Sequence, residues 1–527
     1  MLLSPVYHRE NKKAWENYVI FEDGYLYAFF GTGKKTDDNP YMSAIGLDVY
    51  RSRDGIHFEQ ISEYTNPIPG AHAGFCVKKI GDYFYYYPTC SNEEKGVHFK
   101  IYRTKNFKDW EHLGDEYDVV PDRRFYHDRW DEMVILEDTD NDGRAVYYGY
   151  ITSEPRDDIS APGPGMLKSE DGIHWEVLPP AKVEWGEVPS QHMEVNFVEK
   201  IGEKYYLSMS GRLYLDSYGY SLYTFVGDNP FGPFYPDLEK FRLCGTSRRD
   251  ITWLNHSVHT PWGLLSALWL SHDENPDIPS GSFAISTLKR ILCENGHLRL
   301  GYWDQNDSLF DLSRPLNLNL AAAYPSETLK NERDSVVFDE NGVIKISASR
   351  DGVILLSDSV FDKDKGIMLT GTLKCRENRG HIASHQHAAG MGFYLEEEPG
   401  KGVMIYADTL GVTRTGTLRY ADQAITDFDI YRYSGYGLVR GRSGGLRGTV
   451  DFRFEDTVGP FGHASYAGIR HNVQHSFKLI ARMDYFELYI DDLYVQTYLV
   501  PDTVTGRIGV CMFDGTGEIE IKGYHFL

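Results

Sequence analysis

The chain has 527 residues, with 54 Lys and Arg against 77 Asp and Glu, which gives a formal net charge of −23 at pH 7. This charge argues against nucleic acid and anionic membranes as partners, because both attract mainly lysine and arginine. Aromatic residues make up 14% of the chain, including 38 Tyr. Tyrosine suits sugars, whose ring faces are apolar and whose edges carry hydroxyls, so we expect an oligosaccharide or a small glycoside as the ligand.

The first residues, MLLSPVYHRENKKAW, place Pro5 and charged side chains where a signal peptide has an apolar run. We also find no stretch that is apolar enough to span a bilayer, so the sequence predicts a cytoplasmic protein. The six cysteines lie far apart, without a CxxC motif or a Cys/His spacing typical of a metal site. We therefore predict no metal and no cofactor, and the sequence makes no prediction of the oligomeric state.

One sequence pattern recurs along the first three hundred residues. It consists of a strand, a Ser or Thr, a turn such as Asp-Gly, an aromatic residue and a second strand. The clear copies are DVYRSRDGIHFEQI (48–61), KIYRTKNFKDWEHL (100–113) and GMLKSEDGIHWEVL (165–178), and looser copies cover 221–238 and 283–303. Each copy predicts a β-hairpin, in which the glycine supplies the positive φ that a tight turn requires.

A second, more apolar hairpin precedes each copy, as in YVIFEDGYLYAFFG and NFVEKIGEKYYLSMS. Two hairpins make a four-stranded sheet, and such units recur about every fifty to sixty-five residues. The sequence therefore predicts an all-β fold that begins with a five-bladed β-propeller over residues 1–305.

The pattern changes after Trp303. Residues 306–334 show no strand alternation and are predicted to be a linker. Short alternating strands separated by Gly and Asp turns then fill residues 335–527, for example SFKLIARMDYFELYIDDLYVQTYLV. Many such strands without helical periods predict a C-terminal β-sandwich.

Three acidic residues stand at equivalent places in the predicted propeller. Glu16, Asp131 and Glu194 lie at or just ahead of the apolar inner strands of the first, third and fourth units. Inner strands converge on the propeller axis, so we expect these carboxylates to face one another. Like charges held together raise at least one pKa, and a protonated carboxyl beside an ionised one is what cleavage of a glycosidic bond needs.

The sequences MEVNFVEKIGEKYYLSMS and RWDEMVILEDTDNDGRAVYYGY resemble the fourth-blade and third-blade motifs of the furanosidase clan of glycoside hydrolases. This clan comprises the invertase and inulinase family 32 and the arabinanase and β-xylosidase family 43. The resemblance implies that Glu194 is the general acid, that Asp131 orients the substrate and tunes the acid, and that Glu16 is the nucleophile or base. The last hairpin, with Glu487 ahead of an aromatic residue, resembles the end of the family 32 sandwich.

The chain departs from the clan in two motifs. Trp15-Glu16-Asn17-Tyr18 stands where family 32 has Trp-Asn-Asp-Pro, and Arg129-Trp130-Asp131-Glu132 stands where it has Arg-Asp-Pro. The resemblance therefore implies a divergent member of the clan, and Glu16 is the assignment with the weakest motif. Asp37, Asp128 and Asp250 are alternatives to it.

Further side chains are candidates for holding a sugar. Histidines ahead of inner strands can hydrogen-bond hydroxyls, arginine can do the same, and tryptophan can stack on a sugar ring. These candidates are His72, His127, Arg129, Trp130, His192 and His256. Structural alternatives stay open: Glu194 could anchor backbone N–H groups, Asp131 could pair with Arg129, and each histidine could be structural.

The sequence thus predicts a glycoside hydrolase that acts on fructosides, arabinosides or related glycosides. The sandwich favours the retaining, invertase-like branch of the clan, with an inverting arrangement as its competitor. Two other functions stay open. One is a glycoside phosphorylase, for which the basic segment TSRRD (246–250) is the candidate phosphate site, and the other is a non-catalytic, carbohydrate-binding propeller.

Overall fold

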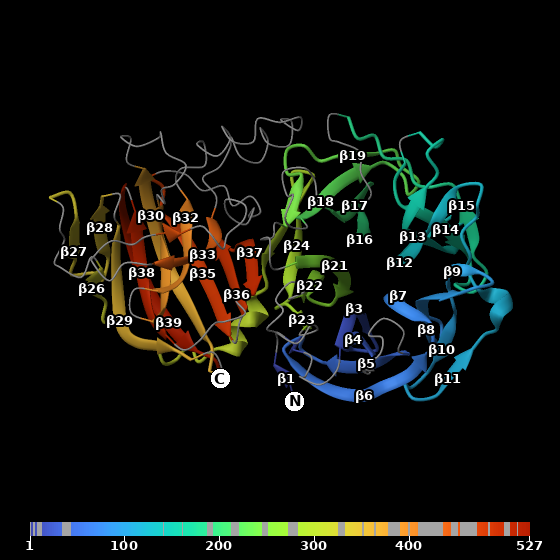
Figure 1. Ribbon diagram of the computed structural model, residues 1–527, viewed down its shortest axis with the longest axis horizontal. Helices are drawn as coiled ribbons and strands as arrows, with labels where there is room; N and C mark the ends of the chain where they lie inside the picture. Colours follow the sequence, from blue (N-terminus) through green and yellow to red (C-terminus); the bar gives the residue numbers. More distant parts are fainter. Residues whose placement is uncertain are drawn as a thin grey trace. The chain divides into compact units, whose positions relative to one another are not determined.

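The computed structural model contains almost only β-strands, as the sequence predicts (Figure 1). It describes residues 2–3, 6–7, 13–33, 44–140, 142–160, 162–186, 193–211, 221–244, 251–271, 283–324, 332–349, 352–362, 365–377, 390–398, 401–408, 436–443, 452–453, 472–482, 485–499, 506–513 and 515–527. Two 3-10 helices are described, η1 (Asp115–Tyr117) and η3 (Asp304–Leu309). Within these residues no helix is long and apolar enough to cross a membrane.

The chain divides into two compact units. The first comprises Met1–Leu213, Leu222–Phe241 and Thr252–Leu298, and the second comprises Tyr214–Ser221, Arg242–Ile251 and Arg299–Leu527. The predicted boundaries at residues 305 and 335 stay a prediction. Strand β26 (Ala321–Tyr324) lies inside the segment predicted as a linker, and it pairs with β29 (Val353–Phe361).

Antiparallel sheets follow one another along the first unit. The first sheet contains β3 (Lys13–Glu22), β4 (Tyr25–Gly33), β5 (Ile45–Ser52) and β6 (His57–Ile68). The second contains β7 (Ala71–Ile80), β8 (Tyr83–Asn92), β9 (Gly96–Phe99), β10 (Tyr102–Thr104) and β11 (Trp110–His112). The third contains β12 (Tyr126–Thr139), β13 (Ala145–Pro155), β14 (Gly165–Ser169) and β15 (Glu176–Leu178).

The next strands continue in chain order. The fourth sheet contains β16 (Glu194–Ile201), β17 (Lys204–Gly211), β18 (Ser221–Gly227) and β19 (Phe234–Pro236). After β20 (Arg242–Cys244) come β21 (Ile251–Thr260), β22 (Gly263–Ser271), β23 (Phe283–Ile285), β24 (Lys289–Glu294) and β25 (His297–Tyr302). The short strands β1 (Leu2–Leu3) and β2 (Val6–Tyr7) pair with β6 and β23, so the start of the chain joins the first sheet to the last strands of the unit.

The first strands of these sheets gather around a common axis. Strand β7 packs beside both β3 and β12, and β12 packs beside β16. A pocket in this unit is lined by all of these strands and by β21, through residues 18–22, 77–79, 134–135, 196–199 and 256–259. The inner strands therefore meet around this pocket although they are distant in the sequence.

The repeated turns fold as their sequence predicts, and the reason is local. Gly55 has a φ of 72°, its N–H donates to Ser52 Oγ at 2.9 Å, and Asp54 Oδ1 accepts the N–H of His57 at 2.9 Å. Gly172 repeats this arrangement, with a φ of 73° and an N–H that donates to Ser169 Oγ at 2.8 Å. Because all these bonds join residues within five positions, the sequence alone specifies the turn.

The second unit contains two antiparallel arrays of strands. One runs in the order β37 (Leu493–Leu499), β36 (Tyr485–Ile490), β35 (His475–Arg482), β30 (Ile367–Glu377), β39 (Gly515–His525), β28 (Ile344–Ala348) and β27 (Ser335–Phe338). The other runs in the order β26, β29, β38 (Gly506–Phe513), β31 (Gly390–Glu398), β32 (Lys401–Asp408), β33 (Tyr436–Ser443) and β34 (Phe452–Arg453). Their apolar faces share one core, in which Phe393 and Phe477 lie 4.7 Å apart, as expected for a sandwich.

Candidate active site

The three predicted carboxylates belong to one electrostatic cluster at the starts of β3, β12 and β16. Glu16 and Glu194 are buried, with 7% and 9% of each residue exposed, and Asp131 is partly buried. Arg129 lies between two of them: its guanidinium donates to Glu194 Oε1 at 2.8 Å, and its Nε lies 3.3 Å from Asp131 Oδ2. The structure therefore brings Glu16, Asp131, Glu194 and Arg129 together.

Irregular strand pairing presents these side chains. One extra residue lies on β3 between Ala14 and Asn17, where Glu16 stands, and β12 and β16 have further shifts at Asp131/Met133 and Val195/Phe197. A β-bulge bends its strand and redirects the side chains beside it, and bulges are frequent next to active sites. The regular alternation of inward and outward side chains, on which the sequence analysis relied, therefore breaks at the residues that carry the candidate chemistry.

A fourth carboxylate, Glu132, joins the cluster, and the sequence analysis did not select it. Its side chain is hydrogen-bonded to Glu16, and Thr152 Oγ1 donates to its Oε2 at 3.1 Å. In a regular strand, neighbouring residues point to opposite faces, so Asp131 and Glu132 would diverge. The adjacent acidic pair was visible in the sequence, but the shift in strand pairing that turns both residues to the site was not.

Burial governs the ionisation of this cluster. It raises the pKa of Glu16 well above its usual range, and the charges of Asp131 and Glu194 add to this effect. Burial likewise raises the pKa of Glu132, with Glu16 as the strongest charge. Burial also raises the pKa of Asp131, although Arg129 opposes the shift. The site thus binds protons more tightly than isolated carboxyls do.

Arg129 affects the protonation of Glu194, the predicted general acid. The sequence analysis expected the charge of Asp131 to favour a proton on Glu194, but the structure places a guanidinium in hydrogen bond with Glu194. A guanidinium favours the ionised form of a carboxyl, so it opposes the protonation that a general acid needs. The structural alternative for Asp131, an ion pair with Arg129, also occurs in the structure, because the two side chains are in contact.

The candidate sugar-binding residues differ in position. His72 is exposed as a whole, and its imidazole bonds Ser91 Oγ at 2.7 Å. Partial desolvation of the imidazole lowers the pKa of His72, and the nearby carboxylate of Asp131 opposes this shift. His127 is partly buried, and its role stays a prediction. His192 lies outside the described residues, as do the alternatives Asp37 and Asp250.

Two further candidates, Trp130 and His256, are buried, and burial rules out the first as a sugar platform. Trp130 is 0% exposed, donates from Nε1 to Val119 O at 3.2 Å and packs on Tyr126, so it is a core residue rather than a platform for a sugar. His256 is 5% exposed and lies 4.4 Å from the ring of Tyr18. Burial lowers the pKa of His256 to about 4, so this imidazole is neutral at pH 7. His256 also lines the pocket among the inner strands, so its role in holding a sugar stays a prediction.

Asp128, the remaining alternative, is also excluded from the cluster. Its side chain is 88% exposed and pairs with Arg123 at 2.5 Å. The acidic residue that completes the cluster from β12 is Glu132, not Asp128.

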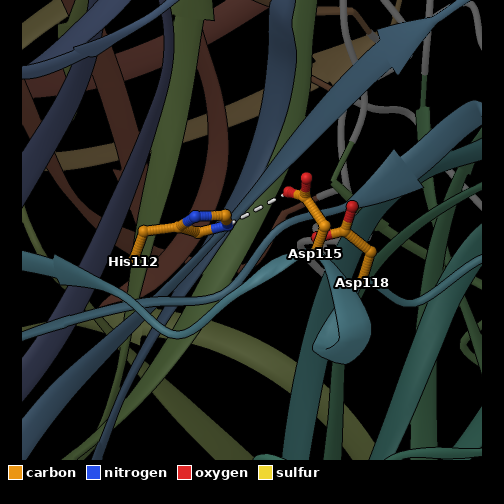
Figure 2. Close-up of side chains that lie close together, drawn as sticks. All are labelled: His112, Asp115 and Asp118. Carbon is orange, nitrogen blue, oxygen red and sulfur yellow. Dashed lines mark ion pairs between the residues drawn. The ribbon is translucent and has the colours of Figure 1, made fainter.

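Another group of polar side chains lies beside β11 and is shown in Figure 2. His112, Asp115 and Asp118 offer ligand atoms within 4.8 Å of one another. However, Lys100 donates to Asp115 Oδ1 and Lys95 to Asp118 Oδ2, both at 2.7 Å. These ammonium groups already neutralise the carboxylates, so we interpret the group as a network of ion pairs rather than as a metal centre.

With this geometry established, comparisons with known proteins place the fold. No family model and no curated protein matches the sequence. Solved structures do match along nearly the whole chain. Exo-inulinase from Aspergillus awamori has a TM-score of 0.61 at 9% identity, over 99% of this chain and 97% of that one. The chain has the fold of the family 32 fructofuranosidases.

Two further structures agree with this result. Fructan 1-exohydrolase IIa from Cichorium intybus has a TM-score of 0.61 at 11% identity, over 99% of this chain and 97% of that one. Sucrose-6-phosphate hydrolase from Lactobacillus gasseri has a TM-score of 0.59 at 12% identity, over 98% of this chain and 90% of that one. The predicted resemblance to the furanosidase clan is therefore confirmed as a family 32-like fold, and the low identities agree with a divergent chain.

Proposed function

We propose that the protein is a glycoside hydrolase that cleaves furanosidic bonds, with fructosides as its substrates. The observation that carries this proposal is the convergence of Glu16, Asp131 and Glu194 from three inner strands. The fold supports the same conclusion, because the similar structures are named as an inulinase, a fructan exohydrolase and a sucrose-6-phosphate hydrolase. We further propose that the inner strands β3, β7, β12, β16 and β21 each begin one blade of a five-bladed propeller.

The carboxylates divide the chemistry in the following way. In the retaining route, a carboxylate oxygen of Glu16 attacks the anomeric carbon of the sugar. At the same time the bond between this carbon and the leaving oxygen breaks, and Glu194 donates a proton to the leaving oxygen. Water then attacks the anomeric carbon, the bond to Glu16 breaks, and Glu194 takes the proton that the water loses. Asp131 and Arg129 hold the sugar and Glu194 in place, and exposed His72 lies within reach of a bound sugar.

A panel of substrates tests the reaction class. Sucrose, 1-kestose, inulin and levan would be incubated with the protein beside arabinan, a nitrophenyl arabinofuranoside and a nitrophenyl xyloside, with and without phosphate. We expect free fructose at a rate that phosphate does not change. A sugar phosphate as the product would instead indicate a phosphorylase, and binding without turnover of any substrate would indicate a carbohydrate-binding propeller. The candidate phosphate segment 246–250 lies outside the described residues.

The stereochemistry is tested separately. NMR of the first sugar released should show the anomer of the substrate, as expected when Glu16 forms a covalent intermediate. If the opposite anomer appears first, then Glu16 acts as a base on water, and the protein follows the inverting route.

A further inference from the structure

Glu132 occupies an unusual position on β12. Its φ of 49° lies in the left-handed region, which non-glycine residues seldom adopt, and it stands at the shift in strand pairing between Asp131 and Met133. Such a conformation persists only where its surroundings hold it, and it is typical of functional positions. On β12 it turns the carboxyl of Glu132 to Glu16, which belongs to β3.

Strand β7 lies between these two strands and leaves room for the contact. A Cβ atom on Gly74 would lie 2.6 Å from Glu132 N and 3.0 Å from Glu132 Cγ, so only glycine fits there. The next residue, Phe75, bonds the carboxyl of Glu16 through its backbone N–H. One short stretch of β7 therefore both admits Glu132 and holds Glu16.

The hydrogen-bond partners of the two carboxyls differ in kind. Thr152 Oγ1 accepts the N–H of Val195 at 3.0 Å and donates to Glu132 Oε2 at 3.1 Å, so Oε2 is an acceptor. The other oxygen of Glu132 can then carry a hydrogen toward Glu16. Glu16 accepts this hydrogen bond together with the bond from Phe75 N–H. Apart from this shared bond, each carboxyl has one outside partner among the described residues. The N–H of Phe75 can only donate to Glu16, whereas the hydroxyl of Thr152 can donate or accept, so the surroundings favour the ionised form at Glu16 and tolerate the neutral acid at Glu132.

We propose that Glu132 is a protonated carboxylic acid that donates its hydrogen bond to Glu16 and thereby keeps Glu16 as the ionised carboxylate of the site. Glu132 is then a positioning residue, which acts through Glu16 and does not touch the substrate. The role in turnover rests on the proposed function, whereas the protonation of Glu132 does not. The arrangement solves a problem of this site, because Glu16 must be ionised although it is buried among other acids.

The charges around the pair agree with one shared proton. The groups that face Glu132 are Glu16 from β3, Asp131 and Arg129 from β12, and Glu194 from β16, while His72 on β7 faces Asp131. Arg129 is the cation among them, and it is bonded to Glu194 and Asp131. Among the residues that the structure describes, a second negative charge on the Glu16–Glu132 pair would therefore have no counter-ion in direct contact, which favours a pair that retains its proton.

Three variants test this role in turnover. Glu132→Gln keeps a neutral donor, and we expect it to lower kcat by less than about tenfold, with the acidic limb of the pH–rate profile near that of the natural protein. Glu132→Ala removes the donor, and we expect kcat to fall about tenfold to a hundredfold, the worth of one hydrogen bond to an ionised group. Its acidic limb should move to higher pH, because Glu16 then ionises less readily. Glu137→Gln, on the same strand with a half-exposed side chain, is the control and should match the natural protein.

Two outcomes would overturn the proposal. If Glu132→Gln loses as much activity as Glu132→Ala, the residue is needed in its ionised form. If Glu132→Ala leaves the acidic limb in place, Glu132 has only a structural role.

Infrared spectroscopy tests the proton without any substrate. The difference spectrum between the natural protein and Glu132→Gln at neutral pH should contain the carbonyl band of a protonated carboxylic acid, and the corresponding spectrum for Glu137→Gln should lack it. A carboxylate band in its place would refute the neutral state of Glu132. This result does not depend on the substrate panel, so a protein that hydrolyses no furanoside could still show the band.

Discussion

Two buried glutamates, Glu487 in the second unit and Glu132 in the first, differ in what surrounds them. Glu487 is fully buried, and each of its oxygens receives a hydroxyl: Tyr489 donates to Oε1, and Thr497 donates to Oε2 at 2.8 Å. Glu132 receives one hydroxyl, and the charges that act on it come mainly from other acids, with Arg129 as the cation. A carboxylate among hydroxyl donors anchors strands, whereas a carboxylate among carboxylates holds protons that can move.

The largest expected effect concerns Glu194. Glu194→Gln keeps the shape of the side chain but removes the proton that it can transfer, so turnover of fructosides should slow by about two to four orders of magnitude. An aryl fructoside with an activated leaving group should suffer far less, because it needs no acid. Kinetics on both substrates, together with urea unfolding, measure the change. Unfolding of the variant, or unchanged turnover of sucrose or inulin, would make Glu194 an anchor like Glu487.

Gly74→Ala should damage the acidic cluster without changing any acid. The new methyl group would press on Glu132 N at 2.6 Å, so β7 and β12 must separate, at a cost of about 1 to 3 kcal/mol in unfolding free energy. The kcat of the variant should fall as well, because Phe75 and Glu132 then hold Glu16 less firmly in place. Gly81→Ala is the control: its φ of 58° makes alanine unfavourable, but no atom lies within 4 Å of the new Cβ. Gly81→Ala should lose stability and keep its kcat. Equal losses of kcat in Gly74→Ala and Gly81→Ala would contradict the role of Gly74 in holding the acidic cluster.

Glu487→Gln should show the reverse pattern. The amide offers one acceptor where two hydroxyls donate, so the unfolding free energy should fall by about 1 to 3 kcal/mol. Activity per folded molecule should stay the same, since the residue serves as an anchor. Glu340→Gln, at an exposed turn of the same unit, should change neither quantity. A loss of kcat in Glu487→Gln without a loss of stability would remove the distinction between the two glutamates.

The smallest expected effect is a change in the pH dependence of stability. The pKa values of Glu16 and Glu132 are raised above their ordinary 4.5 in the folded protein, so between these values the folded chain binds more protons than the unfolded one. Their stabilising contribution is therefore complete below about pH 4.5 and is lost as the pH rises toward the folded-state pKa. Glu132→Gln removes one such group and should flatten this decline by up to about 1.4 kcal/mol per pH unit. Urea unfolding at several pH values measures the slope, and an unchanged slope would contradict a raised pKa at Glu132.

The sequence predicted the repeated hairpins and the sandwich because the interactions that form them are local. Ser52, Asp54 and Gly55 complete their turn with bonds over at most three residues, and the apolar alternation of each strand is written in the strand itself. The equivalent starts of β3, β12 and β16 also followed from the repeat, which is why Glu16, Asp131 and Glu194 could be selected before any coordinates were known.

Tertiary structure alone decided the rest. Trp130 follows Arg129 directly, and strand alternation separates the two, but only packing decides that Trp130 faces the core while Arg129 bonds Glu194. Glu132 enters the site through a shift in strand pairing, a left-handed backbone and the space beside Gly74, which lies 58 positions earlier in the chain. Contacts between strands that are distant in sequence arise only when the sheets pack around their axis, and so the fourth carboxylate of the site could not be selected from the order of the residues.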